Sequence, residues 1–171
     1  GTGHHETTYM MMQSMLDNAD LIRNNVVMDM GCGTALLAIL AAKMGAAKVY
    51  GIDIDAVAAQ SAYDNARLNR VGRKVETYCG DASLLQMGKY NVLLANIHRN
   101  IIIMDLRTYA GSLKAGGLLM LSGFYTTDVE AIMAEAVKYG LELVCERERD
   151  GWACLTLRRT SPVSISSILG A

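Results

Sequence analysis

The feature that most constrains the fold of this chain is the alternation of short apolar runs with longer segments of helical periodicity. Such alternation is typical of a parallel sheet in which a helix follows each strand. The predicted strands lie at residues 26–30, 48–52, 74–79, 90–95, 117–122, 141–149 and 152–158. The predicted helices lie at residues 6–22, 34–45, 55–70, 101–113 and 128–139. We therefore expect an α/β fold, with a doubly wound, seven-stranded, mostly parallel sheet and helices on both faces.

The last two predicted strands depart from this alternation. Only Asp150-Gly151 separates 141–149 from 152–158, and this dipeptide favours a two-residue hairpin turn. Because a hairpin reverses the chain direction, we expect a C-terminal antiparallel hairpin strand. The residues that follow, 160–171, are rich in serine and are expected to form an extended tail.

Composition limits the classes of protein to consider. The 171 residues correspond to one domain at about 150 residues per domain. Hydrophobic residues make up 51% of the chain and charged residues 19%, which excludes intrinsic disorder as the dominant state. Basic and acidic residues number 16 and 17, so we expect no direct binding of nucleic acid. No apolar run approaches the roughly 18 residues of a membrane span, so we expect no membrane association.

The cysteines indicate a redox compartment. Cys32, Cys79, Cys145 and Cys154 are widely spaced, without a Cys-x-x-Cys pair. This spacing favours free thiols over a zinc site or a disulfide framework. We therefore expect a cytoplasmic protein without a metal site.

The first predicted strand runs into a glycine-rich turn at residues 29–33, Asp-Met-Gly-Cys-Gly. Gly31 and Gly33 permit a tight turn that lets a ligand approach the backbone. Asp53 ends the next strand, about 20 residues later, at the spacing of an acid that binds ribose hydroxyls. The dinucleotide fingerprint requires a third glycine where this chain has Leu36. The turn therefore fits a nucleoside with a short amino-acid arm, which describes S-adenosylmethionine, and Asp29 is placed to receive its ammonium group.

Two other predicted strand ends carry polar residues. Asp81 follows strand 74–79, where it can accept a hydrogen bond from the amino group of adenine, cap a helix, or do both. Asn96 follows strand 90–95. It is either a turn residue or a carboxamide beside the methyl group, whose carbonyl oxygen orients an acceptor nitrogen.

On these motifs the chain resembles the class I methyltransferases that use S-adenosylmethionine. Within them it resembles the bacterial enzymes that methylate ribosomal protein eleven of the large-subunit stalk base. The resemblance covers residues 1–159 and is most specific at residues 1–8 and 95–97, because the glycine turn is shared by all class I enzymes. The matching segments are residues 1–8, 28–34, 51–55, 64–66, 95–97, 121–123 and 151–156.

The resemblance implies a Rossmann-like fold and S-adenosylmethionine as cofactor, with S-adenosylhomocysteine as product. It implies methylation of protein amino groups, lysine or N-terminal amines, on a ribosomal large-subunit protein. It also implies the cofactor contacts, which are Thr8, Gly31, Asp53 and Asn96, with His5 closing over the cofactor. We therefore expect residues 1–159 to form a methyltransferase domain with helix 6–22 as its lid.

The family also has a separate N-terminal domain that recognises the ribosomal protein, and this domain is not part of the sequence. We therefore expect either an excised catalytic domain or a longer chain whose start is not included. The partner, a ribosomal protein, is expected to bind through that domain.

The chemistry expected of Asn96 is orientation of a neutral amine for in-line attack on the methyl group. His98 or His5 can relay the proton, although His98 also suits a helix start at the pocket rim. Two alternatives stay open: a small-molecule or RNA methyltransferase of the same fold, and a module that binds S-adenosylmethionine without catalysis.

Overall fold

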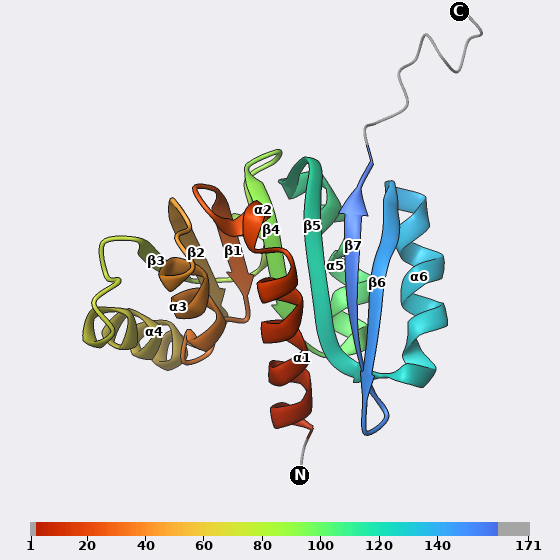
Figure 1. The fold of residues 1–171 in the computed structure, drawn as a ribbon, viewed down its shortest axis with the longest axis horizontal. Helices are drawn as coiled ribbons and strands as arrows, with labels where there is room; N and C mark the ends of the chain where they lie inside the picture. The colour runs from red at the N-terminus through yellow and green to blue at the C-terminus, as the bar shows by residue number, and fades with distance from the viewer. Residues whose placement is uncertain (1–2, 161–171) are drawn as a thin grey trace, which may run out of the picture.

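A computed structural model describes residues 3–160, which form one sheet covered by helices on both faces (Figure 1). The sheet order is β3-β2-β1-β4-β5-β7-β6. β1 to β5 pair in parallel, and β7 runs antiparallel to both β5 and β6. The strands are β1 (Val26–Met30), β2 (Lys48–Asp53), β3 (Val75–Cys79), β4 (Tyr90–Asn96), β5 (Leu113–Tyr125), β6 (Leu141–Arg149) and β7 (Trp152–Arg159). This arrangement confirms the predicted seven-stranded, mostly parallel sheet.

Helices fill the outer layers on either side of this sheet. The α-helices are α1 (His4–Asp17), α2 (Ala19–Ile22), α3 (Leu36–Lys43), α4 (Ala56–Leu68), α5 (Arg99–Ser112) and α6 (Val129–Ala136). Three short 3-10 helices are η1 (Ala82–Leu84), η2 (Thr126–Asp128) and η3 (Val137–Tyr139). α1 to α4 pack on one face, and α5 and α6 pack on the other.

The sheet separates two apolar cores. In β4, Val92 and Leu94 face the core beneath α1 and α3, whereas Leu93 and Ala95 face the core beneath α5. All four are fully buried. Burial on both faces explains why this strand reads in sequence as a continuous apolar run rather than an alternating one.

The predicted helix 6–22 is in fact two helices. α1 ends at Asp17 and α2 begins at Ala19, because Asn18 leaves the helical conformation at φ −116° and its side chain bonds back to the Ser14 carbonyl at 2.8 Å. Met10 and Met15 are buried in the core, as helical periodicity indicates.

β5 is much longer than the predicted strand 117–122. Its pairing with β4 shifts register between Tyr90 and Val92, and its pairing with β7 shifts between Ser122 and Phe124. These irregularities let the strand continue to Tyr125 past Gly123, which has φ 102°. The apolar run marks only the buried middle of the strand, so sequence periodicity underestimated its length.

Local turn chemistry was predicted better. Asp150 and Gly151 both have positive φ, at 51° and 82°, as a type I′ hairpin turn requires. The predicted helix 128–139 is divided into η2, α6 and η3, and Gly140 ends it at φ 71°. The predicted tail from 161 onward lies outside the described residues.

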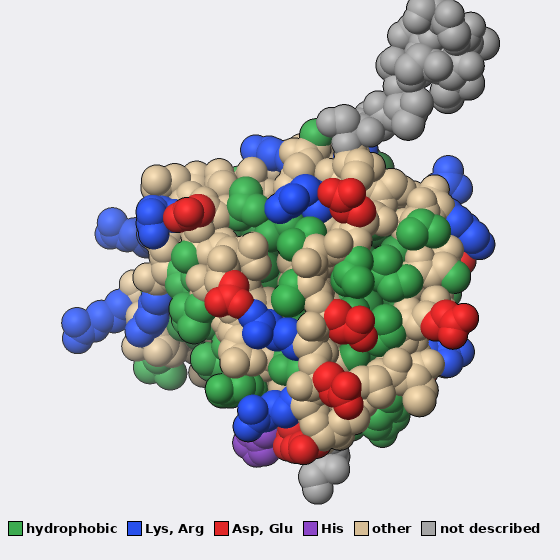
Figure 2. Space-filling model, turned by 45° about the vertical axis from the view of Figure 1, so that its right-hand side comes forward, with side chains coloured by type: hydrophobic (Ala, Val, Ile, Leu, Met, Phe, Trp, Pro, Cys, Tyr) green, Lys and Arg blue, Asp and Glu red, His purple; other side chains and the backbone are tan. Residues whose placement is uncertain are grey.

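Charged side chains of both signs are interspersed on the face turned to the viewer in Figure 2. This agrees with the balanced net charge of −1. Within residues 3–160, no helix has both the length and the hydropathy needed to cross a bilayer.

Candidate functional site

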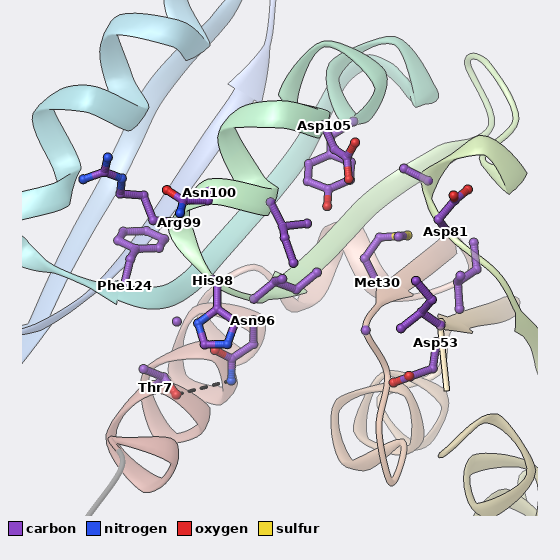
Figure 3. A pocket seen from close by; sticks show the side chains of 18 of the residues that line it. Thr7, Met30, Asp53, Asp81, Asn96, His98, Arg99, Asn100, Asp105 and Phe124 are labelled. Atoms are coloured by element: carbon purple, nitrogen blue, oxygen red, sulfur yellow. Dashed lines mark hydrogen bonds between the residues drawn. The ribbon is translucent and has the colours of Figure 1, made fainter. Parts of the chain in front are cut away.

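A cavity of about 1330 Å³ lies at the carboxyl ends of the parallel strands. Neighbouring β1 and β4 are where the strand order reverses, and open α/β sheets bind ligands at such a switch point. Met30 and Gly31 reach the cavity from the end of β1, Asp53 from β2, and Asn96 from β4. Figure 3 shows Asp53 and Asp81 toward one side of the cavity and Thr7, Asn96 and His98 toward another.

The glycine turn between β1 and α3 is held against β2. The Gly31 and Cys32 N–H groups both donate to the Ile52 carbonyl, at 2.7 and 3.0 Å. Gly31 has φ 68°, and a Cβ atom there would stand 3.3 Å from the Ile97 side chain, which lines the cavity. A side chain at this position would narrow the cavity, so the glycine keeps room for a ligand.

Gly33 contributes to the site through its backbone. Its φ is 52°, and within residues 3–160 no heavy atom apart from its own and those of its chain neighbours lies within 4 Å of the place a Cβ would occupy. Its N–H donates to Asp53 Oδ2 at 2.9 Å. Gly33 therefore orients Asp53 through its backbone N–H. It is not among the described residues that line the cavity.

Asp53 is fixed through both carboxylate oxygens. Oδ2 accepts from Gly33, and Oδ1 accepts from the Asp55 N–H at 2.9 Å. A carboxylate offers about four lone-pair sites, so each oxygen can accept one more hydrogen bond. This geometry suits a vicinal diol such as that of a ribose.

Asp29 lies beneath the turn rather than in the cavity, as judged from the described lining residues. It is only 3% exposed. Burial raises the pKa of Asp29 to about 7. A backbone hydrogen bond with Ala38 lowers the pKa by less than burial raises it, and the Asp53 charge adds to the increase. Burial of Cys32, with the Asp29 and Asp53 charges nearby, raises the pKa of its thiol to about 12, so the thiol stays protonated at neutral pH.

Asp81 is the N-cap of η1. Its Oδ1 accepts from the Ser83 N–H at 2.9 Å, and the contacts with Ser83 lower its pKa. The side chain is exposed and lines the cavity. The predicted capping role is thus confirmed, and Asp81 remains ionised and able to accept a second hydrogen bond from a ligand.

Asn96 meets α1 at another part of the cavity. Its Nδ2 donates to Thr7 Oγ1 at 3.3 Å, and Thr7 Oγ1 donates to the His4 carbonyl at 3.2 Å (Figure 3). This contact uses the amide nitrogen and leaves Asn96 Oδ1 as a hydrogen-bond acceptor for an incoming amine. His98 is exposed and takes the N-cap position of α5, with no side-chain cap within the described structure. This position of His98 agrees with the predicted helix start at the rim of the pocket.

α1 reaches the cavity near its N-terminus. His4 and Thr7 line the cavity, whereas the sequence interpretation named His5 and Thr8, which are not among the described lining residues. Residues three apart share one face of a helix, so turning Thr7 inward turns Thr8 away. The buried series Thr7, Met10, Met11, Ser14 and Met15 is the signal that could have found this face.

The cavity also holds residues that the sequence interpretation missed. Arg99 and Asp128 form an ion pair at 3.1 Å, and the Tyr125 and Trp152 rings stack with their centroids 4.2 Å apart. Asp105 and Tyr109 reach the cavity from α5. In the part of the chain that the structure describes, no group of three or more His, Cys, Asp or Glu side chains is placed to hold a metal ion.

Comparison with known sequences places these features in a family. Residues 1–160 match the family model described as ribosomal protein L11 methyltransferase (PrmA). The chain belongs to this family. A ribosomal protein L11 methyltransferase from Porphyromonas gingivalis is 47% identical over 163 residues, covering 95% of this chain and 55% of that protein. One from Bacteroides fragilis is 42% identical over 156 residues, covering 91% and 55%. The chain thus spans about half the length of these family members.

Solved structures support the fold of this family member. A ribosomal protein L11 methylase from Lactobacillus delbrueckii subsp. bulgaricus superposes with a TM-score of 0.86 at 24% identity, covering 93% of this chain and 81% of that one. An RNA methyltransferase from Salinibacter ruber, in complex with S-adenosyl-L-homocysteine, superposes with a TM-score of 0.71 at 19% identity, covering 90% and 92%. At these identities the likeness concerns the fold alone.

Proposed function

We propose that this chain is the catalytic domain of a methyltransferase that uses S-adenosylmethionine to methylate amino groups of ribosomal protein L11, on lysines or at the N-terminus. The observation that carries the proposal is the switch-point cavity, where Gly31, Asp53 and Asn96 meet in a member of this family.

The described residues fit this cofactor. Gly31 leaves open the space that a side chain would take, Asp53 offers acceptors to a ribose diol, and Asp81 offers one to the adenine amino group. When bound, S-adenosylmethionine supplies an electrophilic methyl group on a positively charged sulfur. Asp29, beneath the turn, adds an acidic group near the place proposed for the amino-acid arm.

The residues of the chain then position the acceptor. Asn96 Oδ1 accepts a hydrogen bond from the amine and aims its lone pair, and Thr7 holds the amide in that orientation. Because the departing sulfur is neutral, the site needs no general acid. The amine must be neutral to react, and His98 at the rim is available to carry its proton to solvent.

Calorimetric titration tests the cofactor proposal. S-adenosylhomocysteine should bind the chain, and Asp53→Ala should weaken binding at least tenfold, because both ribose contacts are lost. Asp55→Ala is the matched control: it removes a neighbouring carboxylate that caps α4 through the Val57 N–H, and it should leave affinity unchanged. The absence of binding by the wild-type chain, or equal binding by Asp53→Ala, would contradict the proposal.

The acceptor is tested separately. Labelled S-adenosylmethionine should transfer methyl groups to ribosomal protein L11, and transfer should be more efficient with a full-length member of this family than with this chain, which spans about half that length. Because the proposed substrate is a ribosomal protein, we also infer that the protein acts in the cytoplasm. Transfer to RNA with none to the protein would favour the alternative reading.

A further inference from the structure

The cavity contains one polar group that has no role in the site described so far. Tyr109, on α5, lines the cavity although its residue is fully buried. Within residues 3–160, its hydroxyl is the one buried side-chain oxygen or nitrogen without a hydrogen-bond partner. Buried hydroxyls in folded proteins nearly always have a hydrogen-bond partner. An exception at a cavity wall therefore indicates a hydroxyl that is available to bind a ligand.

The surroundings of Tyr109 are acidic. Asp105 lies one helical turn earlier on α5 and also lines the cavity. Partial burial raises the pKa of Asp105, and the Asp81 charge raises it further. Burial, assisted by the Asp105 charge, raises the pKa of Tyr109 as well. The hydroxyl therefore stays protonated at neutral pH and can donate a hydrogen bond.

These groups belong to the nucleoside side of the cavity. Asp81 caps η1, and η1 packs against α5. In Figure 3, Asp105 and Asp81 lie away from Thr7 and Asn96. The ligand at this side must offer an acceptor to a buried phenol, whereas the carboxylates of Asp81 and Asp105 accept from a donor. A purine ring satisfies both requirements, because its ring nitrogens accept and its exocyclic amino group donates.

We infer that Tyr109 is a further cofactor-binding residue, whose hydroxyl donates a hydrogen bond to a ring nitrogen of the bound adenine. The inference rests on the proposed function, since it assigns the group that the proposed cofactor places at this end of the cavity. It assigns Tyr109 a role in affinity and in selection of the base, and none in the chemistry of methyl transfer.

This role predicts opposite effects on the free and bound protein. A hydroxyl buried without a partner contributes nothing to the stability of the free protein, so Tyr109→Phe should melt at the same temperature or higher. The same substitution should weaken binding of S-adenosylhomocysteine roughly 3- to 20-fold, because one hydrogen bond to the ligand is lost. A tyrosine that served only in packing would not combine a loss of affinity for S-adenosylhomocysteine with an unchanged or higher melting temperature.

Tyr90→Phe is the matched control. Tyr90 is buried in the same apolar core, and its hydroxyl already accepts from the Gln86 N–H at 3.4 Å. It does not appear among the described residues that line the cavity. Removal of the Tyr90 hydroxyl should lower stability slightly and leave affinity for S-adenosylhomocysteine unchanged.

Ligand analogues identify the accepting atom without altering the protein. Titrations use S-adenosylhomocysteine and its 1-deaza, 3-deaza and 7-deaza analogues with wild type and Tyr109→Phe. One analogue should bind the wild type more weakly than the parent does, and it should bind both proteins equally, because the partner nitrogen is gone.

Two results would overturn the inference. Equal affinity of both proteins for S-adenosylhomocysteine would mean that the hydroxyl meets only water. Wild-type binding of all three analogues as tight as that of the parent would exclude a ring nitrogen as its partner. A wild-type chain that binds no S-adenosylhomocysteine would instead contradict the proposed function itself.

Discussion

At the scale of single residues, three polar groups of the site are fixed by the backbone or by α1 before any ligand arrives. Asp53 is held by two N–H groups, Asp81 by its capping contact with Ser83, and Asn96 by Thr7. Each uses only part of its hydrogen-bonding capacity. Preorganised groups of this kind lose little conformational entropy on binding, which favours affinity and alignment.

Asp29 is the residue whose burial has the clearest energetic consequence. Its pKa is about 7 in the folded chain, against 3.8 as the ordinary value. Because the folded pKa is the higher one, the folded state retains a proton that the unfolded state has lost, and stability falls as pH rises from about 4 to about 7. Above pH 7 the loss is complete and the contribution is constant.

Asp29→Asn should remove this dependence on pH. The stability gain of the variant over wild type should be about 2 to 3 kcal/mol larger at pH 8 than at pH 5, because only the wild type must ionise a buried carboxyl. Urea denaturation at the two pH values measures the difference. A gain that is the same at both would show that Asp29 titrates as in the unfolded chain.

At the scale of elements, the end of β5 packs closely against Ile97, which lines the cavity. Gly123 has φ 102°, and a Cβ there would lie 2.5 Å from the Ile97 carbonyl oxygen. Ile97 directly follows Asn96 and is itself paired to β5 through the Ser122 carbonyl at 2.9 Å. The close approach of β5 to the end of β4 therefore depends on the absence of a side chain at residue 123.

Gly123→Ala should destabilise the chain by roughly 2 to 4 kcal/mol, since it adds a backbone clash to the strain of a positive φ. Gly116→Ala is its control on the same strand. Gly116 also has a positive φ, 78°, but within the described structure no heavy atom apart from its own and those of its chain neighbours lies within 4 Å of the place a Cβ would occupy. Its cost should be about 1 kcal/mol, from backbone strain alone. Equal losses in thermal unfolding would show that the clash at Ile97 is relieved at no cost.

At the scale of the whole molecule, the site is assembled across the sheet. Thr7 and Asn96 are 89 residues apart in sequence, and their side chains meet because α1 packs across the face of the sheet beside β5 and β7. α1 is thus part of the apolar core on that face, through Met10, Met11 and Met15. Packing of α1 and orientation of Asn96 are therefore coupled.

Thr7→Val tests this coupling with little change of shape. Loss of the hydroxyl that receives Asn96 Nδ2 should lower kcat/KM for methyl transfer about tenfold, because the amide is no longer aligned, while affinity for S-adenosylhomocysteine changes little. Thr7→Ser keeps the hydroxyl and should retain most of the activity. A serine variant as impaired as the valine variant would assign the effect to packing of α1 instead.

The sequence by itself determined the features that follow from local patterns. Alternating apolar runs predicted the order of strands and helices, Asp150-Gly151 the hairpin turn, and Asp81 an N-cap, and the observed structure agrees. The glycine turn and Asp53 were also predictable together, since the carboxyl ends of neighbouring parallel strands meet at one edge of a sheet. These features depend on residues close in sequence or on a general rule of sheet topology.

Only the tertiary structure decided which side chains turn toward the cavity. It turned His4 and Thr7 toward the cavity, buried Asp29 beneath the turn, and brought Tyr109 to the cavity wall with no partner for its hydroxyl among residues 3–160. The physical reason is that a helix side chain moves through about 100° from one residue to the next. Which side chain reaches the cavity is therefore set by packing against residues far away in the chain.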